Sequence, residues 1–234
     1  MVFNITECVD FHHGKRIVIT ILVCGHDVVI IMHKEGDALL IQQPVYYPFS
    51  EAIVLNKRKL VNNRLVYEDG KYSIDFEDFE RKIVDEKVKL FILCSPHNPV
   101  GRVWTEAELR KMGEICLKHK VVIVDEAYID FGGETALSLI NKYDNLIVTR
   151  TFSKSRSMAG MRIGYCIGNE QLISVLNSVK FSFNSYTMSD VAIKCGVASI
   201  DDDTYFKNIV AKIIDTREKT KESLTKLGFS FLDS

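Results

Sequence analysis

Three short polar stretches hold the residues best suited to chemistry, and each follows a run of apolar residues. They are SPHNPVG at 95–101, DEAY at 125–128 and TFSKSRSMAGMR at 151–162. A buried carboxylate can hold a proton on a ring nitrogen, a lysine can form a Schiff base with an aldehyde, and an arginine flanked by hydroxyls can bind a phosphate. An aldehyde, a pyridine ring and a phosphate together describe pyridoxal 5′-phosphate, PLP.

These stretches need a scaffold that brings them together, and the apolar pattern predicts one. Amphipathic segments separate the apolar runs, and the segment 105–119 begins with a capping-box signal made by Thr105 and Glu108. An Asp-Gly pair within 67–72 indicates a turn, in either a hairpin or a loop link. The pattern therefore predicts an α/β fold, a largely parallel sheet flanked by helices, whose carboxyl edge gathers the three stretches. The near-continuous apolar runs that read as strands lie at 38–42, 90–94, 121–125, 146–149 and 163–168.

Four motifs in register resemble those of the fold-type I PLP-dependent enzymes, the aminotransferase class I/II family. They are PVY at 44–46, NPVG at 98–101, DEAY at 125–128 and SKSRSMAGMR at 153–162. The resemblance implies that Tyr46 stacks on the cofactor ring and that Asn98 and Tyr128 bond the ring hydroxyl.

The same resemblance implies the residues that carry the reaction. Asp125 would lie at the pyridine nitrogen, and Lys154 would be the Schiff-base lysine. Ser153 and Arg162 would bind the phosphate. The implied catalytic residues are therefore Lys154, Asp125 and Tyr128, and no metal is implied.

The resemblance divides between two branches of the family. Residues 38–120 are most similar to the cystathionine β-lyase-like C–S lyases, whereas residues 125–234 look like histidinol-phosphate aminotransferase. The lyase branch is expected to carry a histidine where this chain has Tyr128. The sequence therefore favours transamination between an amino acid, such as histidinol phosphate, and a 2-oxo acid. A C–S β-lyase is the alternative.

Two departures from the family pattern favour a third reading, a non-catalytic binding or dimerisation module. Residues 1–35 lack the Gly-rich or Ser/Thr helix start that normally holds the phosphate. The arginine of the small domain, which binds the substrate carboxylate, is not found either. We predict a divergent segment at 1–35, a PLP-binding large domain at 36–200, and a linker helix leading toward a small domain at 201–234. The chain would then be a fragment or a recombined gene. The helix is expected to end at Gly228, before a short strand at 229–232.

Composition narrows the class of protein further. The formal net charge of −1 gives no electrostatic signature for nucleic acid or an anionic membrane. The apolar run at 17–32 is too short and interrupted to span a bilayer. Six scattered cysteines without a C-x-x-C pair are typical of free thiols in a reducing compartment. We expect a cytoplasmic protein without a signal peptide and, from the resemblance, a homodimer.

Two polar features have simpler explanations than a second site. His97 could serve as a general base, but a histidine packed within its loop is the stronger interpretation. A zinc site is not expected, because the spacing of the N-terminal cysteines and histidines fits no known zinc finger. Those residues are Cys8, His12, His13, Cys24 and His26.

Overall fold

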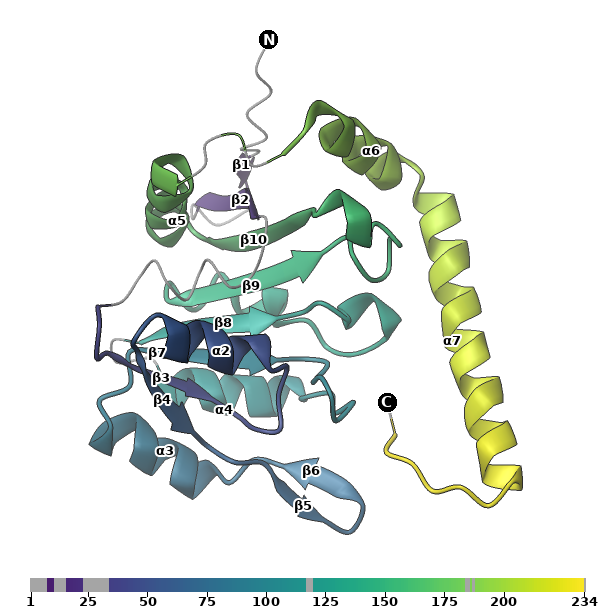
Figure 1. The fold of residues 1–234 in the computed structure, drawn as a ribbon, viewed down its shortest axis with the longest axis horizontal. Helices are drawn as coiled ribbons and strands as arrows, with labels where there is room; N and C mark the ends of the chain where they lie inside the picture. Colours follow the sequence, from purple (N-terminus) through teal and green to yellow (C-terminus); the bar gives the residue numbers. More distant parts are fainter. Residues whose placement is uncertain are drawn as a thin grey trace.

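The computed structural model describes residues 34–116, 120–183, 186 and 188–233, except for the side chains of residues 179 and 183 (Figure 1). It also describes the backbone of two N-terminal strands. Its centre is an eight-stranded sheet of order β1-β2-β10-β9-β8-β7-β3-β4. The strands are β1 (Cys8–Asp10), β2 (Arg16–Leu22), β3 (Ala38–Ile41), β4 (Lys59–Asn62), β7 (Leu90–Cys94), β8 (Val121–Asp125), β9 (Leu146–Thr151) and β10 (Gly164–Asn169).

Five consecutive strands of the sheet, β4, β3, β7, β8 and β9, are parallel. β10 pairs antiparallel with β9, and β2 and β1 continue the sheet by further antiparallel pairing. The predicted α/β fold with a largely parallel sheet is confirmed, and each of the five expected strands is present within two residues of its expected ends. Parallel strands end at one common edge, so this topology determines where the polar stretches lie.

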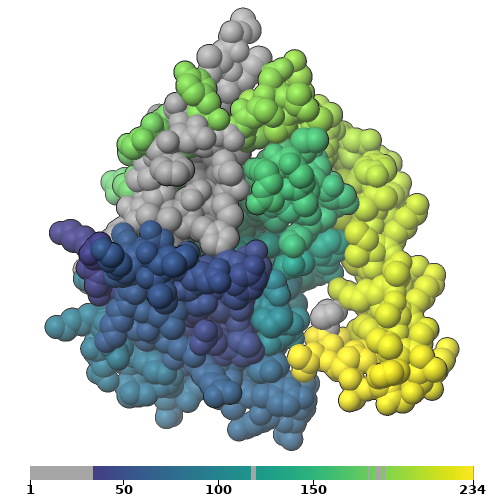
Figure 2. Space-filling view, in the orientation of Figure 1, coloured from purple at the N-terminus to yellow at the C-terminus, as the bar shows by residue number. Residues whose placement is uncertain are grey.

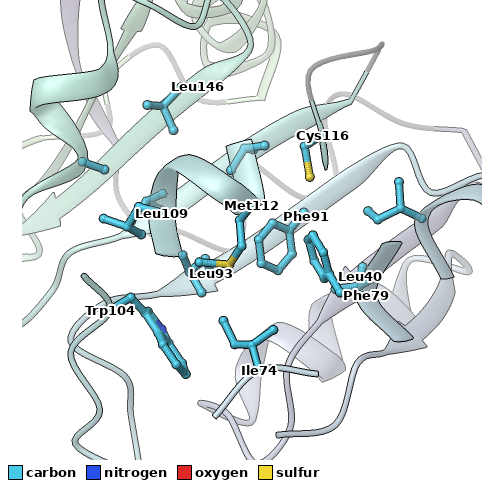
Figure 3. Packing of buried hydrophobic residues seen from close by; sticks show 14 of the residues in the cluster. Leu40, Ile74, Phe79, Phe91, Leu93, Trp104, Leu109, Met112, Cys116 and Leu146 are labelled. Atoms are coloured by element: carbon cyan, nitrogen blue, oxygen red, sulfur yellow. The ribbon is translucent and has the colours of Figure 1, made fainter. Parts of the chain in front are cut away.

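Helices cover both faces of the sheet (Figure 1). α2 (Pro48–Leu55) and α5 (Glu170–Phe183) pack on one face, whereas α3 (Phe76–Asp85) and α4 (Glu106–Cys116) pack on the other. β7 is buried on both sides, because Leu90 and Ile92 face the α2 and α5 side while Phe91 and Leu93 face α3 and α4. Figure 3 shows Phe91 against Phe79 and Met112. Burying one such side chain contributes roughly 2–3 kcal/mol.

Local signals set the ends of several elements. At α4, the backbone N–H of Glu108 donates to the Thr105 hydroxyl at 3.2 Å, and the N–H of Thr105 donates to the Glu108 carboxylate at 2.8 Å. This reciprocal pair confirms the predicted capping box. The expected turn is also present, within a hairpin formed by β5 (Val66–Glu68) and β6 (Lys71–Ser73). Its turn residues Asp69 and Gly70 both have positive φ, as a tight two-residue hairpin turn requires.

Two helices form the C-terminal part of the described chain. Asp202 separates α6 (Asp190–Asp201) from α7 (Asp203–Lys226), which runs along one side of the molecule (Figures 1 and 2). The helix ends before Gly228, as predicted, and this glycine has a φ of 82°. The short strand expected at 229–232 is wrong. Residues 229–233 have no regular secondary structure, and Phe231 and Leu232 instead fold back along α7.

Several expectations fall on parts of the chain that the structure does not describe. Of the apolar run at 17–32, only the backbone up to residue 22 is described, as part of β2. The histidines and cysteines considered for zinc have side chains that the structure does not describe. Among the described side chains, no group of three His, Cys, Asp or Glu residues could hold a metal ion. Among the described helices, none is both long and apolar enough to cross a membrane.

Candidate functional site

The carboxyl ends of β7, β8 and β9 open into one cavity of about 250 Å³. The loops after these strands meet there because neighbouring parallel strands end at the same edge of the sheet. The structure brings all of the predicted site residues to this cavity, and none is left outside it. They are Tyr46, Asn98, Asp125, Tyr128, Ser153, Lys154 and Arg162.

Asp125 lies at the end of β8, half-buried, with its free side toward the cavity. The backbone N–H of Ala127 donates to its Oδ1 at 3.0 Å, and the side chain of Thr149 on β9 is close enough to favour the ionised form. Burial raises the pKa of Asp125 to about 6, and Glu126 acts in the same direction, whereas Ala127, Thr149 and Lys154 act against it. Desolvation thus outweighs these stabilising contacts, and a cationic group placed opposite the carboxylate would favour its ionised form.

Lys154 approaches the same cavity from the loop after β9. Its Nζ lies 5.1 Å from the centre of the Tyr128 ring, within the range of a cation–π contact. Tyr128 directly precedes the short helix η1 (Ile129–Phe131). The lysine itself is exposed, so the amine can be reached from outside the protein. A lysine amine and a buried carboxylate on one cavity can hold two ends of a polar ring.

The loop that carries Lys154 is anchored by the two residues that follow it. Ser155 is buried and donates a hydrogen bond to the carboxylate of Asp130 in η1. The guanidinium of Arg156 donates to the backbone carbonyl of Ser199 in α6 and lies 4.1 Å from the centre of the Phe206 ring in α7. The loop is therefore tied both to the strand-end loop after β8 and to the C-terminal helices.

Ser153 and Arg162 flank the lysine at the side where an anion could bind. Arg162 is exposed, follows the short helix η3 (Ala159–Met161), and adopts a left-handed φ of 55°. This conformation is unfavourable for a residue with a side chain. Its Nη1 donates to the Ala159 carbonyl at 3.0 Å, which leaves the remaining guanidinium donors available to an anion.

Tyr46 and Asn98 form the opposite wall of the cavity. The Tyr46 ring is 40% exposed and stands edge-on to Phe49 at a centroid distance of 5.7 Å, so part of its surface can receive a flat ligand. The backbone N–H of Asn98 donates to Sγ of Cys94 at 3.4 Å, and the side-chain amide forms no hydrogen bond to another described residue. Burial raises the pKa of the Cys94 thiol, so this thiol stays protonated within the wall.

His97 is buried beside the cavity rather than in it. Its ring stands edge-on to that of Trp104, with 6.0 Å between the ring centres. Neither ring nitrogen has a well-aligned partner among the described side chains and backbone, although the Gln42 backbone is close enough to favour the protonated form. Burial nevertheless lowers the pKa of His97 to about 4. The residue packs within its loop, as the sequence indicated.

Sequence reasoning missed a buried ion pair beneath the cavity. Arg150 on β9 donates to the carboxylate of Glu126 through Nη2 at 2.8 Å and Nε at 3.0 Å. The guanidinium lines the cavity, and the Glu126 side chain is fully buried. One signal was present in the sequence: an arginine at the end of an apolar strand, where a charge needs a partner. Two other cavity residues missed by the sequence are Thr149 and Tyr165.

The chain is similar to known proteins over most of its length. Histidinol-phosphate aminotransferase from Brachyspira hyodysenteriae is 48% identical over 166 residues, which are 70% of this chain and 45% of that protein. A PLP-bound putative aminotransferase from Clostridium difficile 630 superposes with a TM-score of 0.81 at 29% identity, over 89% of this chain and 57% of that one.

A third similarity is to a lyase. The PLP-bound C–S lyase from Staphylococcus hominis gives a TM-score of 0.76 at 28% identity, over 89% of this chain and 55% of that one. The chain thus spans about half the length of the relatives that it matches. The family model for aminotransferase class I and II matches residues 24–234. With this match across most of the sequence, the chain belongs to the aminotransferase class I and II family.

Proposed function

We propose that this chain forms the PLP-binding part of an aminotransferase that acts on an amino acid and a 2-oxo acid. The observation that carries the proposal is the meeting of Asp125 and Lys154 at one cavity, with Arg162 beside the lysine. PLP combines a pyridine nitrogen, an aldehyde and a phosphate. The cavity provides a carboxylate, an amine and a guanidinium, one for each of these groups, and the residues therefore fit the cofactor.

Each residue would contribute through its own chemistry. When bound, PLP supplies an electron-withdrawing ring that stabilises negative charge at the substrate Cα. Asp125 would hold a proton on the ring nitrogen, and the desolvation of its carboxylate favours pairing with that cationic group. Lys154 would attach the cofactor and then move a proton to and from the substrate carbon as base and acid.

The remaining residues would position the cofactor. Tyr46 offers an aromatic surface for stacking, and the side chains of Asn98 and Tyr128 offer hydrogen bonds to the ring hydroxyl. Ser153 and Arg162 would bind the phosphate through a hydroxyl and a guanidinium.

We propose histidinol phosphate as the amino acid. The proposal rests on the curated relatives that share 41–48% identity with this chain and carry the name histidinol-phosphate aminotransferase. Tyr128, in place of the histidine expected in the lyase branch, also supports it. The alternative activity, C–S β-lysis, is favoured by the likeness to solved C–S lyases at 27–28% identity.

One pair of assays separates these activities. The purified chain would be offered imidazole-acetol phosphate with glutamate in one reaction and cystathionine in the other. Glutamate-dependent turnover supports the aminotransferase, whereas pyruvate released from cystathionine alone supports the lyase. Turnover of neither substrate by a chain that still forms a borohydride-reducible adduct on Lys154 would favour a binding module without catalysis.

Three further features belong to this proposal. We propose a homodimer, as the family resemblance implies, and sedimentation at several concentrations tests it. We propose a cytoplasmic location, supported by the thiols of Cys94, Cys116 and Cys195, which form no disulfide among the described residues. We also propose that residues 36–200 form the cofactor-binding domain, that 1–35 are a divergent N-terminal segment, and that 201–234 form a linker helix that leads toward a small domain.

A further inference from the structure

Arg150 and Glu126 form an ion pair directly behind Asp125. The Glu126 carboxylate accepts four hydrogen bonds: two from Arg150, one from the Thr135 hydroxyl at 2.9 Å and one from the backbone N–H of Ala136 at 2.6 Å. Thr135 and Ala136 lie at the start of the short helix η2 (Ala136–Leu139). Both oxygens of this carboxylate therefore accept hydrogen bonds, and its negative charge is balanced by one guanidinium.

Such a pair is hard to explain by stability alone. Removing two charges from water costs several kcal/mol per ion, and apolar residues of similar volume often stabilise a protein as well or better. The pair must also be held in place, and Tyr165 does this from the neighbouring strand. It lies directly opposite Arg150 in the β9–β10 register, and its side chain is close enough to favour the charged guanidinium.

The position of the pair suggests what it does. Glu126 is the next residue after Asp125, so two carboxylates leave the end of β8 together. The charged and titratable groups that act on Asp125 are Glu126 from its own loop and Lys154 from the loop after β9, and the thiol of Cys94 on β7 faces it. If Glu126 lacked its guanidinium, Asp125 would lie beside an uncompensated negative charge, which would disfavour the ionised form of Asp125.

We propose that Arg150 is a positioning residue that acts through Glu126: by neutralising this carboxylate, it leaves Asp125 free to remain an anion opposite a protonated ring nitrogen. The second half of this statement rests on the proposed function. The first half concerns only the charges of the chain itself, and the four hydrogen bonds to Glu126 support it. Arg150 need not touch substrate for this role.

The test is a carboxyl titration in the cofactor-free 234-residue chain. Aspartate labelled with ¹³C at the side-chain carboxyl reports its ionisation by NMR, and the Asp125 signal is the one missing from Asp125→Asn. Arg150→Met should raise the midpoint of Asp125 by on the order of one pH unit, because a positive charge is lost. Glu126→Gln should lower the midpoint by a similar amount, because a negative charge is lost and Arg150 remains.

The double substitution is the matched control. Glu126→Gln with Arg150→Met removes one charge of each sign and should return the midpoint close to that of the unchanged chain. A structural role alone would destabilise the variants without moving the midpoint in opposite directions. If Arg150→Met does not fold, Glu126→Gln and the double variant still decide, because neither buries an unpaired carboxylate. Equal midpoints in all variants, or shifts of one sign in both single variants, would overturn the proposal.

These titrations require neither bound cofactor nor turnover, so their failure differs from failure of the proposed function. Opposed shifts in a chain that never forms a reducible adduct at Lys154 would support the role of Arg150 and refute the cofactor assignment. An adduct at Lys154 without opposed shifts would support the cofactor assignment and refute the role of Arg150.

Discussion

Asp125 and Glu126 are consecutive residues with opposite surroundings. The Glu126 side chain is fully buried and paired with Arg150, whereas Asp125 is half-buried, faces the cavity and forms no ion pair with another described residue. The strand geometry explains the difference, because successive side chains at the end of a strand point to opposite sides. One carboxylate is thereby held within the protein and the other is presented to a ligand.

Lys154→Ala should yield a colourless protein after incubation with PLP. Lys154, in the loop after β9, brings an amine to the cavity, so its loss removes the group that can bind an aldehyde covalently. The measurement is the visible spectrum before and after borohydride, followed by peptide mapping. Lys194→Ala, on the exposed surface of α6, is the control and should keep the colour. Reducible cofactor in Lys154→Ala would show that another residue carries it.

Asp125→Asn should keep cofactor binding but slow the reaction of an amino acid with the bound cofactor by on the order of 10²–10³-fold. A neutral amide cannot stabilise a protonated ring nitrogen as a carboxylate does. Stopped-flow absorbance of a single turnover measures this rate even where steady-state turnover is low. Asp85→Asn, on the exposed end of α3, should react at the original rate. An unimpaired Asp125→Asn chain would leave this carboxylate with a structural role only.

Two substitutions of Arg162 should differ in their effect on stability but have the same effect on cofactor affinity. Because its φ of 55° is left-handed, Arg162→Gly should be about 1 kcal/mol more stable than Arg162→Ala in the cofactor-free state. Both variants lack the guanidinium, so both should bind PLP equally weakly compared with the unchanged chain. Urea unfolding and a fluorescence titration with PLP measure the two quantities. A glycine variant that keeps the original affinity would place the phosphate elsewhere.

The cofactor-free chain should show two opposed dependences of stability on pH. Between pH 3.8 and about 6, folded Asp125 keeps a proton that the unfolded chain releases, so the free energy of unfolding falls as pH rises. Between about pH 4 and 6.5, the unfolded chain binds a proton that buried His97 excludes, so the free energy of unfolding rises with pH. Each effect amounts to about 3 kcal/mol, and the two largely cancel.

Single substitutions expose each slope. Relative to that of the unchanged chain, the free energy of unfolding of Asp125→Asn should increase as the pH rises from 4 to 6.5. The free energy of unfolding of His97→Asn, compared in the same way, should decrease across this range. Urea unfolding at half-unit pH intervals gives the slopes, which are independent of the packing changes that shift absolute stability. Identical slopes in the three proteins would show that neither group changes its proton affinity on folding.

The features that could be predicted from the sequence were those that depend on neighbouring residues along the chain. Apolar runs located the parallel strands, and the capping pair of Thr105 and Glu108 located the start of α4. The convergence of the strand-end loops followed from topology. The partner of Glu126 was not predictable, because it depends on the register in which β8 and β9 pair, with Asp125 opposite Thr149. The chain after Gly228 was also mispredicted, since a strand needs a free neighbouring edge that sequence does not reveal.

The pairing of β2 with β10 has a consequence for how the chain folds. Ile17 lies opposite Asn169, so the N-terminal strand joins the sheet through residues from the far end of the cofactor-binding region. Contacts of such large sequence separation form late and slow folding, because a long loop must close before they give any stabilisation. During synthesis, β2 would leave the ribosome long before its partner. We therefore expect the strands from β3 to β9 to assemble first, and β2 to dock in the final slow step.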